Sequence, residues 1–443
     1  MILVYCKNND SKTTVPYGTT LLEYAKQENV TLEYPLLGAL VNNKTRDITY
    51  KIHKPATIQF FDITSPYGHD FYMRTLYFIL YKAVKDLIPE STLKILHSIS
   101  NGKYCELDNL NGELTSVLVE KLKSKMQELI DKNIPIERME MLTAEAIEEF
   151  KKHGLDDKFQ LLRYRNRIFT SVFKMENTIN YYYGYLLPST GYIYLFDLEL
   201  YESGLLLKIP SRKHPTTLSP TRKSEKLFSI YKEYKAWGNS IGVPYVSNLN
   251  KKVVDHEVQD TILITEAFHE KLISQIADQI HQKGSRMVLI SGPSSSGKTT
   301  TCKRISVQLS ILGYHPVQIS VDDFFVEREQ TPLDAQGKYD FEALEAIDLE
   351  LFNKTLSQLL EGKEVELPVF NFTIGSKEWK GHKIQLQKNS VMVIEGIHCL
   401  NPKLTEQIAN DTKFKIFVSA LTSISIDQQN PIPTTDNRLV RRI

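Results

Sequence analysis

The chain has 443 residues, of which 42% are hydrophobic and 24% charged, and its formal net charge is +1. This length exceeds one ordinary domain and predicts about two to four domains with folded cores. The near-zero charge excludes a general electrostatic grip on nucleic acid or on an anionic membrane, while a local basic patch stays open. No stretch approaches the ~20 apolar residues of a membrane span, so we expect a protein without membrane contact.

The four cysteines lie far apart in the sequence, at positions Cys6, Cys105, Cys302 and Cys399. Because no CxxC pair is present, neither a zinc knuckle nor a disulfide framework is indicated. We expect reduced thiols, as in a cytoplasmic protein. The start, MILVYCKNND, lacks the basic leader and apolar core of a signal peptide, which also favours a cytoplasmic location.

The first 62 residues predict a small domain of strands around one helix. The expected elements are strands at 2–5 and 13–16, a helix capped by Thr19 and ending at Gln27, a strand and turn at 39–44, and a closing strand at 56–61. This β-β-α-β-β order, with the segments VPYGTTLLEYA and ALVNNKTRDI, resembles a TGS domain. That family is the ubiquitin-like module at the front of many threonyl-tRNA synthetases.

Residues 63–225 resemble the second, editing domain of threonyl- and alanyl-tRNA synthetases. The amphipathic segment ILYKAVKDLIP at 79–89 is similar to its core helix. The segment LTAEAIEEFKKHGLDDKFQLL at 142–162 is similar to its acidic-start helix, and LLPSTGYIYLFDL at 186–198 to the strand segment after its cysteine–histidine motif. The resemblance implies an α+β fold.

The metal ligands of that family are missing here. Its His-x-x-x-His pair aligns with Arg74 and Phe78, and its Cys-x-x-x-His pair with Tyr182 and Leu186. Phenylalanine and leucine offer no imidazole or thiolate donor. We therefore expect a retained fold without the hydrolytic site. His69 is a conceivable substitute ligand, although a lone histidine is more often polar surface.

Two basic stretches leave RNA contact through the N-terminal half open. Residues 163–167 interleave three arginines with Tyr164, and residues 211–223 hold Arg212, Lys213, Arg222 and Lys223. Such residues can bind phosphate and stack on bases. An ordinary solvated face is the alternative, which the near-zero net charge favours.

Residues 226–284 predict a helical connector. The expected helices are 227–237 and 265–281. The stripe of Phe268, Leu272, Ile276 and Ile280 is expected to pack against the domain that follows.

The segment GPSSSGKTTT at 292–301 predicts a phosphate-binding loop. It follows the apolar run 287–290, precedes the periodic stretch 302–312, and has the full Walker A spacing. Glycines allow the backbone N–H groups to turn around an anion, and the helix N-terminus adds positive potential. We expect Lys298 to reach the terminal phosphates of ATP and the Thr299 hydroxyl to bind Mg²⁺. The expected nucleotide-binding residues are Gly292, Pro293, Ser294, Ser295, Ser296, Gly297, Lys298, Thr299 and Thr300.

A second buried strand, 317–321, ends in two carboxylates, Asp322 and Asp323. Catalytic side chains gather at the carboxyl ends of parallel strands, where a carboxylate can take a proton from an attacking hydroxyl. Residues 320–325, SVDDFF, resemble the Ser-Gln-Asp-Ser-Phe-Tyr motif of uridine–cytidine kinases and phosphoribulokinases. The resemblance implies that Asp322 is the general base. The alternative is an acidic helix cap.

The block at 338–372 resembles the next segment of that kinase family. Its Asn-Phe-Asp-His-Pro motif aligns with residues 340–344, which implies that Glu342 binds the ribose hydroxyls. The base-reading tyrosine, aspartate and histidine align with Phe370, Asn371 and Gly375. Losing these hydrogen-bonding groups removes their discrimination, so the acceptor stays open between nucleosides and other sugar-like alcohols.

A third buried strand, 391–394, ends in Glu395, and 414–419 is expected to be a further core strand. The sequence Glu-Gly-Ile at 395–397 resembles the family's Walker B segment, which implies that Glu395 supports Mg²⁺.

The last eight residues, DNRLVRRI, resemble the start of the kinase lid. The resemblance implies that Arg438, Arg441 and Arg442 clamp the transferring phosphates. The family continues beyond this point, so we expect a kinase domain truncated at the lid, or a catalytically impaired one. A basic tail is the alternative.

The sequence thus predicts a multidomain α+β and α/β protein with four parts: 1–62, a TGS domain; 63–225, an editing-like domain; 226–284, a connector; and 285–443, an incomplete P-loop kinase domain with a parallel sheet. The first hypothesis is ATP- and Mg²⁺-dependent phosphorylation of a nucleoside 5′-hydroxyl. The alternatives are a kinase for a non-nucleoside alcohol, like phosphoribulokinase, and an RNA- or ribosome-associated nucleotide-binding regulator. Oligomerisation stays open.

Overall fold

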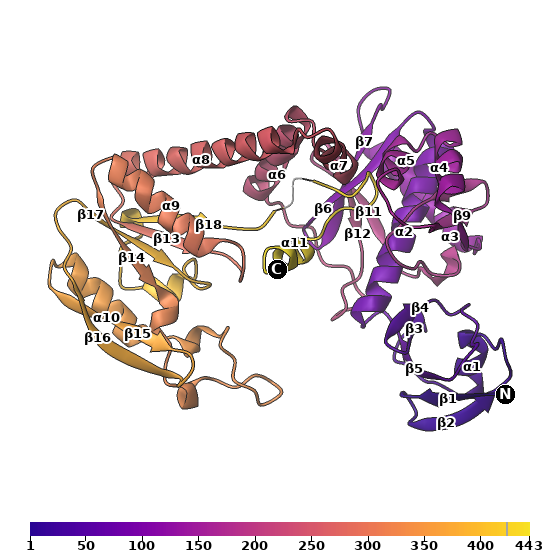
Figure 1. The fold of residues 1–443 in the computed structure, drawn as a ribbon, viewed down its shortest axis with the longest axis horizontal. Coiled ribbons are helices and arrows are strands. Elements are labelled where there is room, and N and C mark those ends of the chain that lie inside the picture. The colour runs from indigo at the N-terminus through magenta and orange to yellow at the C-terminus, as the bar shows by residue number, and fades with distance from the viewer. Residues whose placement is uncertain (422–423) are drawn as a thin grey trace. The chain divides into compact units, whose positions relative to one another are not determined.

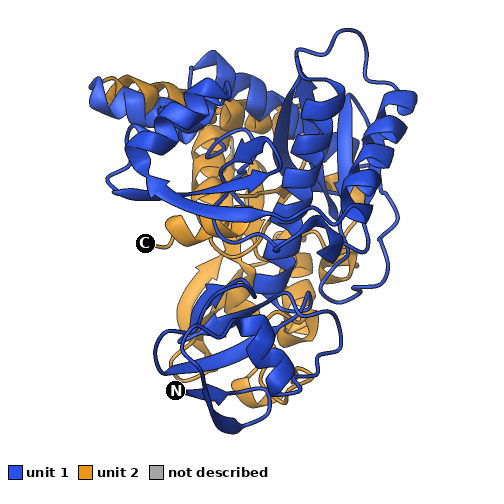
Figure 2. Ribbon diagram, turned by 90° about the vertical axis from the view of Figure 1, so that its right-hand side faces the viewer, with its two compact units in different colours: residues 1–256, 423–433 blue, residues 257–422, 434–443 orange. Residues whose placement is uncertain are grey.

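The structure is a computed structural model that describes residues 1–421 and 424–443. The chain forms two compact units (Figure 2), one of residues 1–256 with 423–433 and one of residues 257–422 with 434–443. No helix among the described residues is long and apolar enough to cross a bilayer.

The first unit begins with a five-stranded sheet, visible in indigo in Figure 1. Its strand order is β2-β1-β5-β3-β4, with bounds Ser11–Val15, Ile2–Cys6, Ala56–Phe61, Gly38–Val41 and Lys44–Arg46. β1 pairs with β2 antiparallel and with β5 parallel. Helix α1, Leu21–Gln27, buries Leu21 and Tyr24 in the core under this sheet.

The cap of α1 differs from the sequence prediction. Thr20 caps the helix, since its hydroxyl accepts from the Glu23 N–H at 3.2 Å while the Glu23 carboxylate accepts from the Thr20 N–H at 2.8 Å. Thr19 was therefore the wrong cap: its hydroxyl donates to the carbonyl of Pro16. A glutamate three residues after the cap completes a capping box, and only Thr20 has that spacing.

Helix α2, Pro66–Leu87, is the central helix of the next part of the first unit. It begins thirteen residues before the predicted 79–89 helix and ends before Pro89, so the predicted bounds were wrong. Proline suits the first helical turn. The extra turns are stable because Phe71, Tyr72 and Phe78 are buried in the same core as the later residues.

Two antiparallel sheets and three helices complete this core. The sheets are β10-β9-β8, with bounds Thr178–Asn180, Phe169–Met175 and Glu137–Leu142, and β11-β12-β7-β6, with bounds Asp197–Tyr201, Gly204–Lys208, Gly102–Asp108 and Thr92–Ile99. The helices are α3, Ser116–Asp131, α4, Thr143–Lys152, and α5, Asp156–Leu162.

Two predictions in this part need correction. The segment 142–162 is not one helix, because Gly154 adopts φ +66° after α4 and the chain restarts as α5. The segment 186–198 is mostly not a strand: it holds the 3₁₀ turn Thr190–Tyr192, and β11 begins only at Asp197.

The predicted connector contains three helices and is divided between the units. Helices α6, Glu225–Ser240, and α7, Val246–Val254, belong to the first unit, and α8, Val258–Lys283, belongs to the second. The short helix α7 was not predicted. Ile276 and Ile280 of α8 join the core around β13 and α9, as the predicted stripe requires.

The second unit is built on a parallel sheet of order β14-β17-β13-β18, with bounds His315–Ser320, Ser390–Glu395, Met287–Ser291 and Lys413–Phe417. Helices α8 and α9, Lys298–Ile311, pack with Val288 and Ile290 of β13. Met287 and Leu289 face the other core, which includes α10, Leu349–Leu360. Burial on both faces explains the continuous apolar run of β13.

A two-stranded antiparallel sheet, β15, Val365–Asn371, and β16, Ser376–Ile384, extends from this unit. The last helix is α11, Thr434–Val440. The predicted mixed α/β architecture with a parallel sheet is confirmed, although β18 ends two residues before the predicted bound.

Candidate phosphotransfer site

The loop 292–297 joins the carboxyl end of β13 to the first residue of α9, Lys298. A Cβ on Gly292 would lie 2.1 Å from the carbonyl oxygen of Val418, so no side chain fits there. Gly297 has φ +99°, a conformation that L-residues with a side chain rarely adopt. Both glycines of the predicted motif are therefore required by the backbone path.

The loop has the features of an anion cradle. The Ser296 hydroxyl is buried and has no hydrogen-bond partner among the described residues. The Lys298 ammonium makes only a long contact, 3.4 Å, to the Pro293 carbonyl. Buried polar groups are ordinarily satisfied, so these groups fit an additional ligand with oxygen acceptors. The phosphates of ATP supply such acceptors, and the N-terminus of α9 adds positive potential.

A magnesium position is indicated beside the loop. β17 runs parallel to β13 and places Glu395 opposite Ile290. The Thr299 hydroxyl donates to Glu395 Oε1 at 2.8 Å. The described residues contain no group of three His, Cys, Asp or Glu side chains suited to a metal. Mg²⁺ typically takes only one or two protein ligands together with phosphates and water, so a hydroxyl and a carboxylate fit it.

We expect Thr299→Ala to raise the Mg²⁺ concentration needed for half-maximal ATP consumption by about 10–100-fold, as seen when a metal site loses a supporting oxygen. The Glu395 carboxylate would lose its hydroxyl donor, and the ion would lose one oxygen. Thr299→Ser, which keeps the hydroxyl, is the control and should titrate like the unmodified protein. Equal Mg²⁺ dependence of the alanine and serine variants would contradict this role.

Asp322 and Asp323 lie in the 3₁₀ turn Val321–Phe324, directly after β14. Burial raises the pKa of Asp322, and the nearby Lys298 and His398 only partly oppose the rise. Burial also raises the pKa of Asp323, whose Oδ1 accepts the Phe370 N–H at 3.3 Å. Asp322 makes no hydrogen bond within the part of the chain that the structure describes. Its carboxylate is thus available as a base beside the loop lysine.

His398 is a site residue that the sequence analysis missed. Its Nε2 is buried without a partner among residues 1–421 and 424–443, and the residue influences the pKa of Asp322. The available signal was its position three residues after Glu395, where the chain leaves a parallel strand at the same edge of the sheet.

A cluster of aromatic rings lies beside the two aspartates. Phe325 contacts Phe370 at 5.5 Å, Phe341 at 6.1 Å and Phe372 at 6.0 Å between ring centroids. Phe370 is thereby brought to the acid pair as predicted. Glu342 follows Phe341 but is exposed, and its side chain has no contact among the described residues that would hold it in place.

The three C-terminal arginines converge on the loop. The Nε of Arg438 donates to the Ser294 carbonyl at 2.8 Å, and that of Arg441 to the Ser295 carbonyl at 3.1 Å. Arg442 donates to the hydroxyls of Ser295 and Ser294 at 2.6 and 2.8 Å. These guanidinium groups are therefore within reach of phosphates bound in the loop.

In the first unit, the positions aligned with synthetase metal ligands form core and surface contacts. Phe78 and Tyr182 are buried with ring centroids 5.6 Å apart. Arg74 pairs with Asp70 at 3.1 Å. His69 Nε2 lies 3.2 Å from the carbonyl of Pro210. None of these side chains approaches a second metal donor set.

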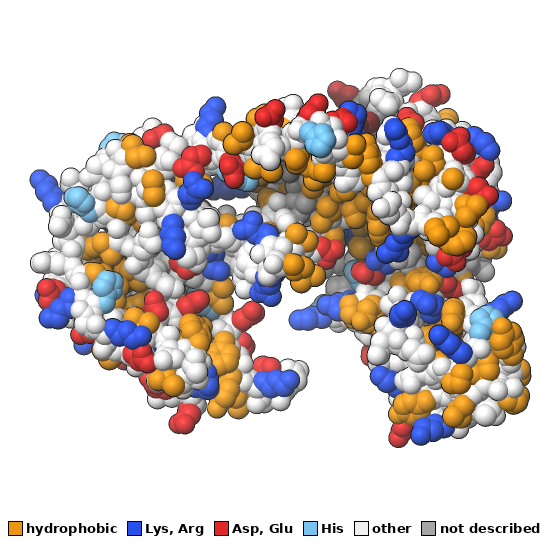
Figure 3. All heavy atoms as spheres, in the orientation of Figure 1, with side chains coloured by type: hydrophobic (Ala, Val, Ile, Leu, Met, Phe, Trp, Pro, Cys, Tyr) orange, Lys and Arg blue, Asp and Glu red, His pale blue; other side chains and the backbone are white. Residues whose placement is uncertain are grey.

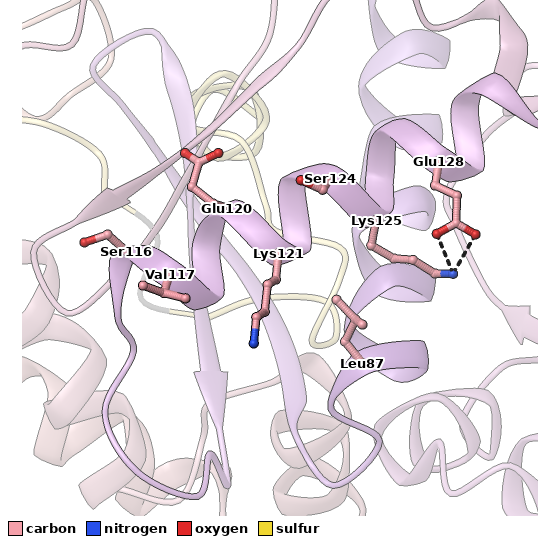
Figure 4. A pocket seen from close by; sticks show the side chains of 8 residues that line it. All are labelled: Leu87, Ser116, Val117, Glu120, Lys121, Ser124, Lys125 and Glu128. Atoms are coloured by element: carbon pink, nitrogen blue, oxygen red, sulfur yellow. Dashed lines mark hydrogen bonds and ion pairs between the residues drawn. The ribbon is translucent and has the colours of Figure 1, made fainter.

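The remaining surface features carry less chemistry. Arg165, from the first basic stretch, donates to the Tyr181 hydroxyl at 2.5 Å, so this cation already has a partner. Basic and acidic side chains are interspersed on the face shown in Figure 3. A groove along α3 is lined by Leu87, Val117 and Glu120, with Lys125 paired to Glu128 (Figure 4). RNA contact stays a prediction.

Comparison with known proteins separates the chain into two relationships. Residues 287–429 match the Phosphoribulokinase / Uridine kinase family. The matched stretch includes the loop, Asp322 and Glu395. The chain is also similar, over its N-terminal region, to threonine–tRNA ligases. These two matches confirm the predicted fusion of a uridine kinase-like segment to a synthetase-like one.

The threonine–tRNA ligase of Clostridium kluyveri is 30% identical over 192 residues, which are 43% of this chain and 30% of the ligase. That of Desulforamulus reducens is 31% identical over 145 residues, 33% of this chain and 23% of the ligase. The matches thus span less than a third of these relatives. A possible uridine kinase from Bacillus stearothermophilus is 23% identical, with a TM-score of 0.26, and covers 30% of this chain and 70% of that one.

Proposed function

We propose that residues 285–443 form an ATP- and Mg²⁺-dependent kinase that phosphorylates a hydroxyl group of a small molecule, with a nucleoside 5′-hydroxyl as the first candidate. The observation that carries this proposal is Asp322. It is a half-buried carboxylate without a hydrogen-bond partner in the described chain, and its raised pKa is influenced by Lys298 of the loop. A nucleotide switch needs no such base, whereas a kinase does.

The other residues have complementary roles. The loop residues 292–300 and Lys298 hold the triphosphate, and Thr299 with Glu395 supports the ion. When bound, ATP supplies the transferred phosphoryl group and Mg²⁺ neutralises its charge. Asp322 receives the proton of the acceptor hydroxyl. The arginines of the C-terminus exchange loop oxygens for phosphate oxygens, where charge-assisted bonds are stronger.

The acceptor is recognised through an aromatic surface. Phe370 and Phe325 place ring faces beside Asp322 and Asp323, and neither ring offers a hydrogen bond. A site of this kind selects by stacking and shape more than by base-edge hydrogen bonds. Glu342 is the candidate for binding sugar hydroxyls. A phosphoribulokinase-like alcohol is the alternative acceptor.

The proposal is tested by measuring ATP consumption with a panel of nucleosides and sugar alcohols. We expect one acceptor to stimulate turnover, and its phosphorylated product to be identified by mass spectrometry. Asp411→Asn, a change of an exposed aspartate in the same unit, is the matched control for Asp322→Asn. No acceptor-dependent ATP loss in the unmodified protein would refute the kinase.

In the first unit we propose a TGS domain at residues 1–62 and an editing-like domain at 63–225. The similarity to threonine–tRNA ligases favours a second candidate function, a nucleotide-binding regulator that contacts RNA. That function predicts tRNA binding that weakens steeply with salt, without acceptor turnover. A filter-binding titration at two salt concentrations, beside the turnover assay, separates the two.

A further inference from the structure

The chain between β18 and α11 returns to the first unit, although both of these elements belong to the second. The described part of this excursion is residues 424–433, which Figure 2 draws in the colour of the first unit. Residues 425–430, here called the anchor turn, make most of its contacts.

Backbone groups of the anchor turn bond to the first unit. Ser425 donates its N–H to the Pro244 carbonyl at 3.2 Å, and its carbonyl accepts the Val246 N–H at 3.0 Å. The Gln428 carbonyl accepts the Ile95 N–H at 2.7 Å. These bonds reach both the start of α7 and an interior strand residue, so the turn is part of the fold of this unit.

The side chains of the anchor turn are buried and satisfied. Asp427 is fully buried, forms an ion pair with the buried Lys158, and accepts the Gln429 and Asn430 N–H groups at 2.9 Å each. Gln429 donates to the Leu93 carbonyl at 2.6 Å and Asn430 to that of Tyr181 at 3.0 Å. Buried polar groups are costly unless paired, so this network favours one conformation of the turn.

The distance from the anchor turn to α11 is short. Pro431, Ile432 and Pro433 are the only residues between Asn430 and Thr434. Four Cα–Cα steps extend at most about 14 Å, and each proline fixes one backbone angle. The start of α11 is therefore confined to a small region around the anchor turn. Arg438 lies only four residues further along.

We propose that the anchor turn, through Asp427, is a positioning element for Arg438, Arg441 and Arg442, so that the first unit sets how these arginines meet the phosphate-binding loop. This inference rests on the proposed kinase function, because the arginines act on phosphates. It assigns the synthetase-like unit a part in phosphoryl transfer that requires no editing chemistry and no RNA.

The test lengthens the connection without altering either end. Inserting Gly-Ser-Gly-Ser between Pro433 and Thr434 in the full chain leaves the anchor turn and α11 unchanged but frees the helix from the turn. We expect kcat to fall by about 10²-fold, the cost typical of misplaced catalytic groups. The same insertion after Gly112, where an added side chain would meet nothing within 4 Å, is the control and should leave kcat unchanged.

A second comparison shows whether the effect passes through the arginines. In a background where Arg438, Arg441 and Arg442 are all changed to Gln, the insertion should cost nothing further, because residues that act as one unit are non-additive. A full additional loss in that background would overturn the proposal, and so would an unchanged kcat in the unmodified background.

Calorimetric ATP binding separates this inference from the kinase proposal. If the unmodified chain turns over no acceptor but binds ATP, the kinase proposal fails, and positioning is decided by whether the insertion weakens ATP binding by about 10-fold or more, roughly one lost charge-assisted bond. Equal ATP affinity of the two chains would then overturn the inference. A chain that binds no ATP overturns both.

Discussion

Asp322→Asn should lower kcat by about 10²–10⁴-fold, the contribution typical of a positioned general base. Asparagine keeps the shape of the side chain but cannot take the proton of an attacking hydroxyl. ATP affinity should change little, because the loop and Lys298 hold the triphosphate. The measurement is steady-state turnover with the acceptor found in the panel, beside calorimetric ATP binding. A variant with unchanged kcat would remove Asp322 from the mechanism.

The same carboxylate predicts how activity depends on pH. Burial raises the pKa of Asp322 above the ordinary aspartate value. A base works only when ionised, so activity should fall as pH decreases through this raised pKa, earlier than an exposed aspartate would cause. The acidic limb of a kcat/KM profile reports it. That limb should be absent from the residual activity of Asp322→Asn.

Stability should move in the opposite direction to activity in this variant. A raised folded-state pKa means that the folded protein binds the proton more tightly than the unfolded chain does. Stability therefore declines as pH rises from the ordinary value through the raised one, and at pH 7 the whole cost is present. Asp322→Asn removes that cost, so its Tm at pH 7 should exceed that of the unmodified protein. Near pH 3 the difference should vanish.

The kinase half shows how much the sequence predicts when chemistry constrains neighbouring residues. Gly292, Gly297 and Lys298 were assigned by spacing, and the backbone path requires both glycines. Glu395 was placed by the end of an apolar strand, and it lies within hydrogen-bond distance of Thr299. These predictions succeeded because a phosphate loop and parallel strands bring residues together by local rules.

The misses have physical causes of a different kind. Helix α2 began earlier than predicted because aromatic residues near its start are buried by distant strands, which periodicity cannot show. His398 has an isolated position in the sequence and acquires its setting only from β14. The anchor turn was missed altogether, since Asp427 reads as a polar loop residue and its partner Lys158 is 269 positions away. Long-range polar pairing leaves no local pattern.

That pair yields the largest stability effect expected in the chain. Lys158→Met should destabilise the first unit by about 3–5 kcal/mol at pH 7, the cost of removing one partner from a buried ion pair. Methionine fills similar space but leaves the fully buried Asp427 without its cation. Asp157, whose carboxylate lies 3.6 Å from Lys158, loses the same neighbour.

The chain contains two tryptophans, Trp237 in α6 of the first unit and Trp379 in β16 of the second. In a Trp379→Phe background, the fluorescence of Trp237 reports urea unfolding of the first unit. The control is Lys152→Met, which breaks an ion pair to Glu149 whose lysine side chain is 68% exposed. That change should cost no more than about 1 kcal/mol.

The pH dependence of Lys158→Met distinguishes a charge effect from a packing defect. Burial raises the pKa of Asp427, and removing the lysine raises it further. The folded variant therefore takes up a proton at a higher pH than its unfolded chain, and its stability deficit should shrink as pH falls through that folded pKa. A neutral carboxyl can still accept the N–H groups of Gln429 and Asn430. A deficit of constant size from pH 7 to pH 4 would mean that the lysine stabilises this turn by packing alone.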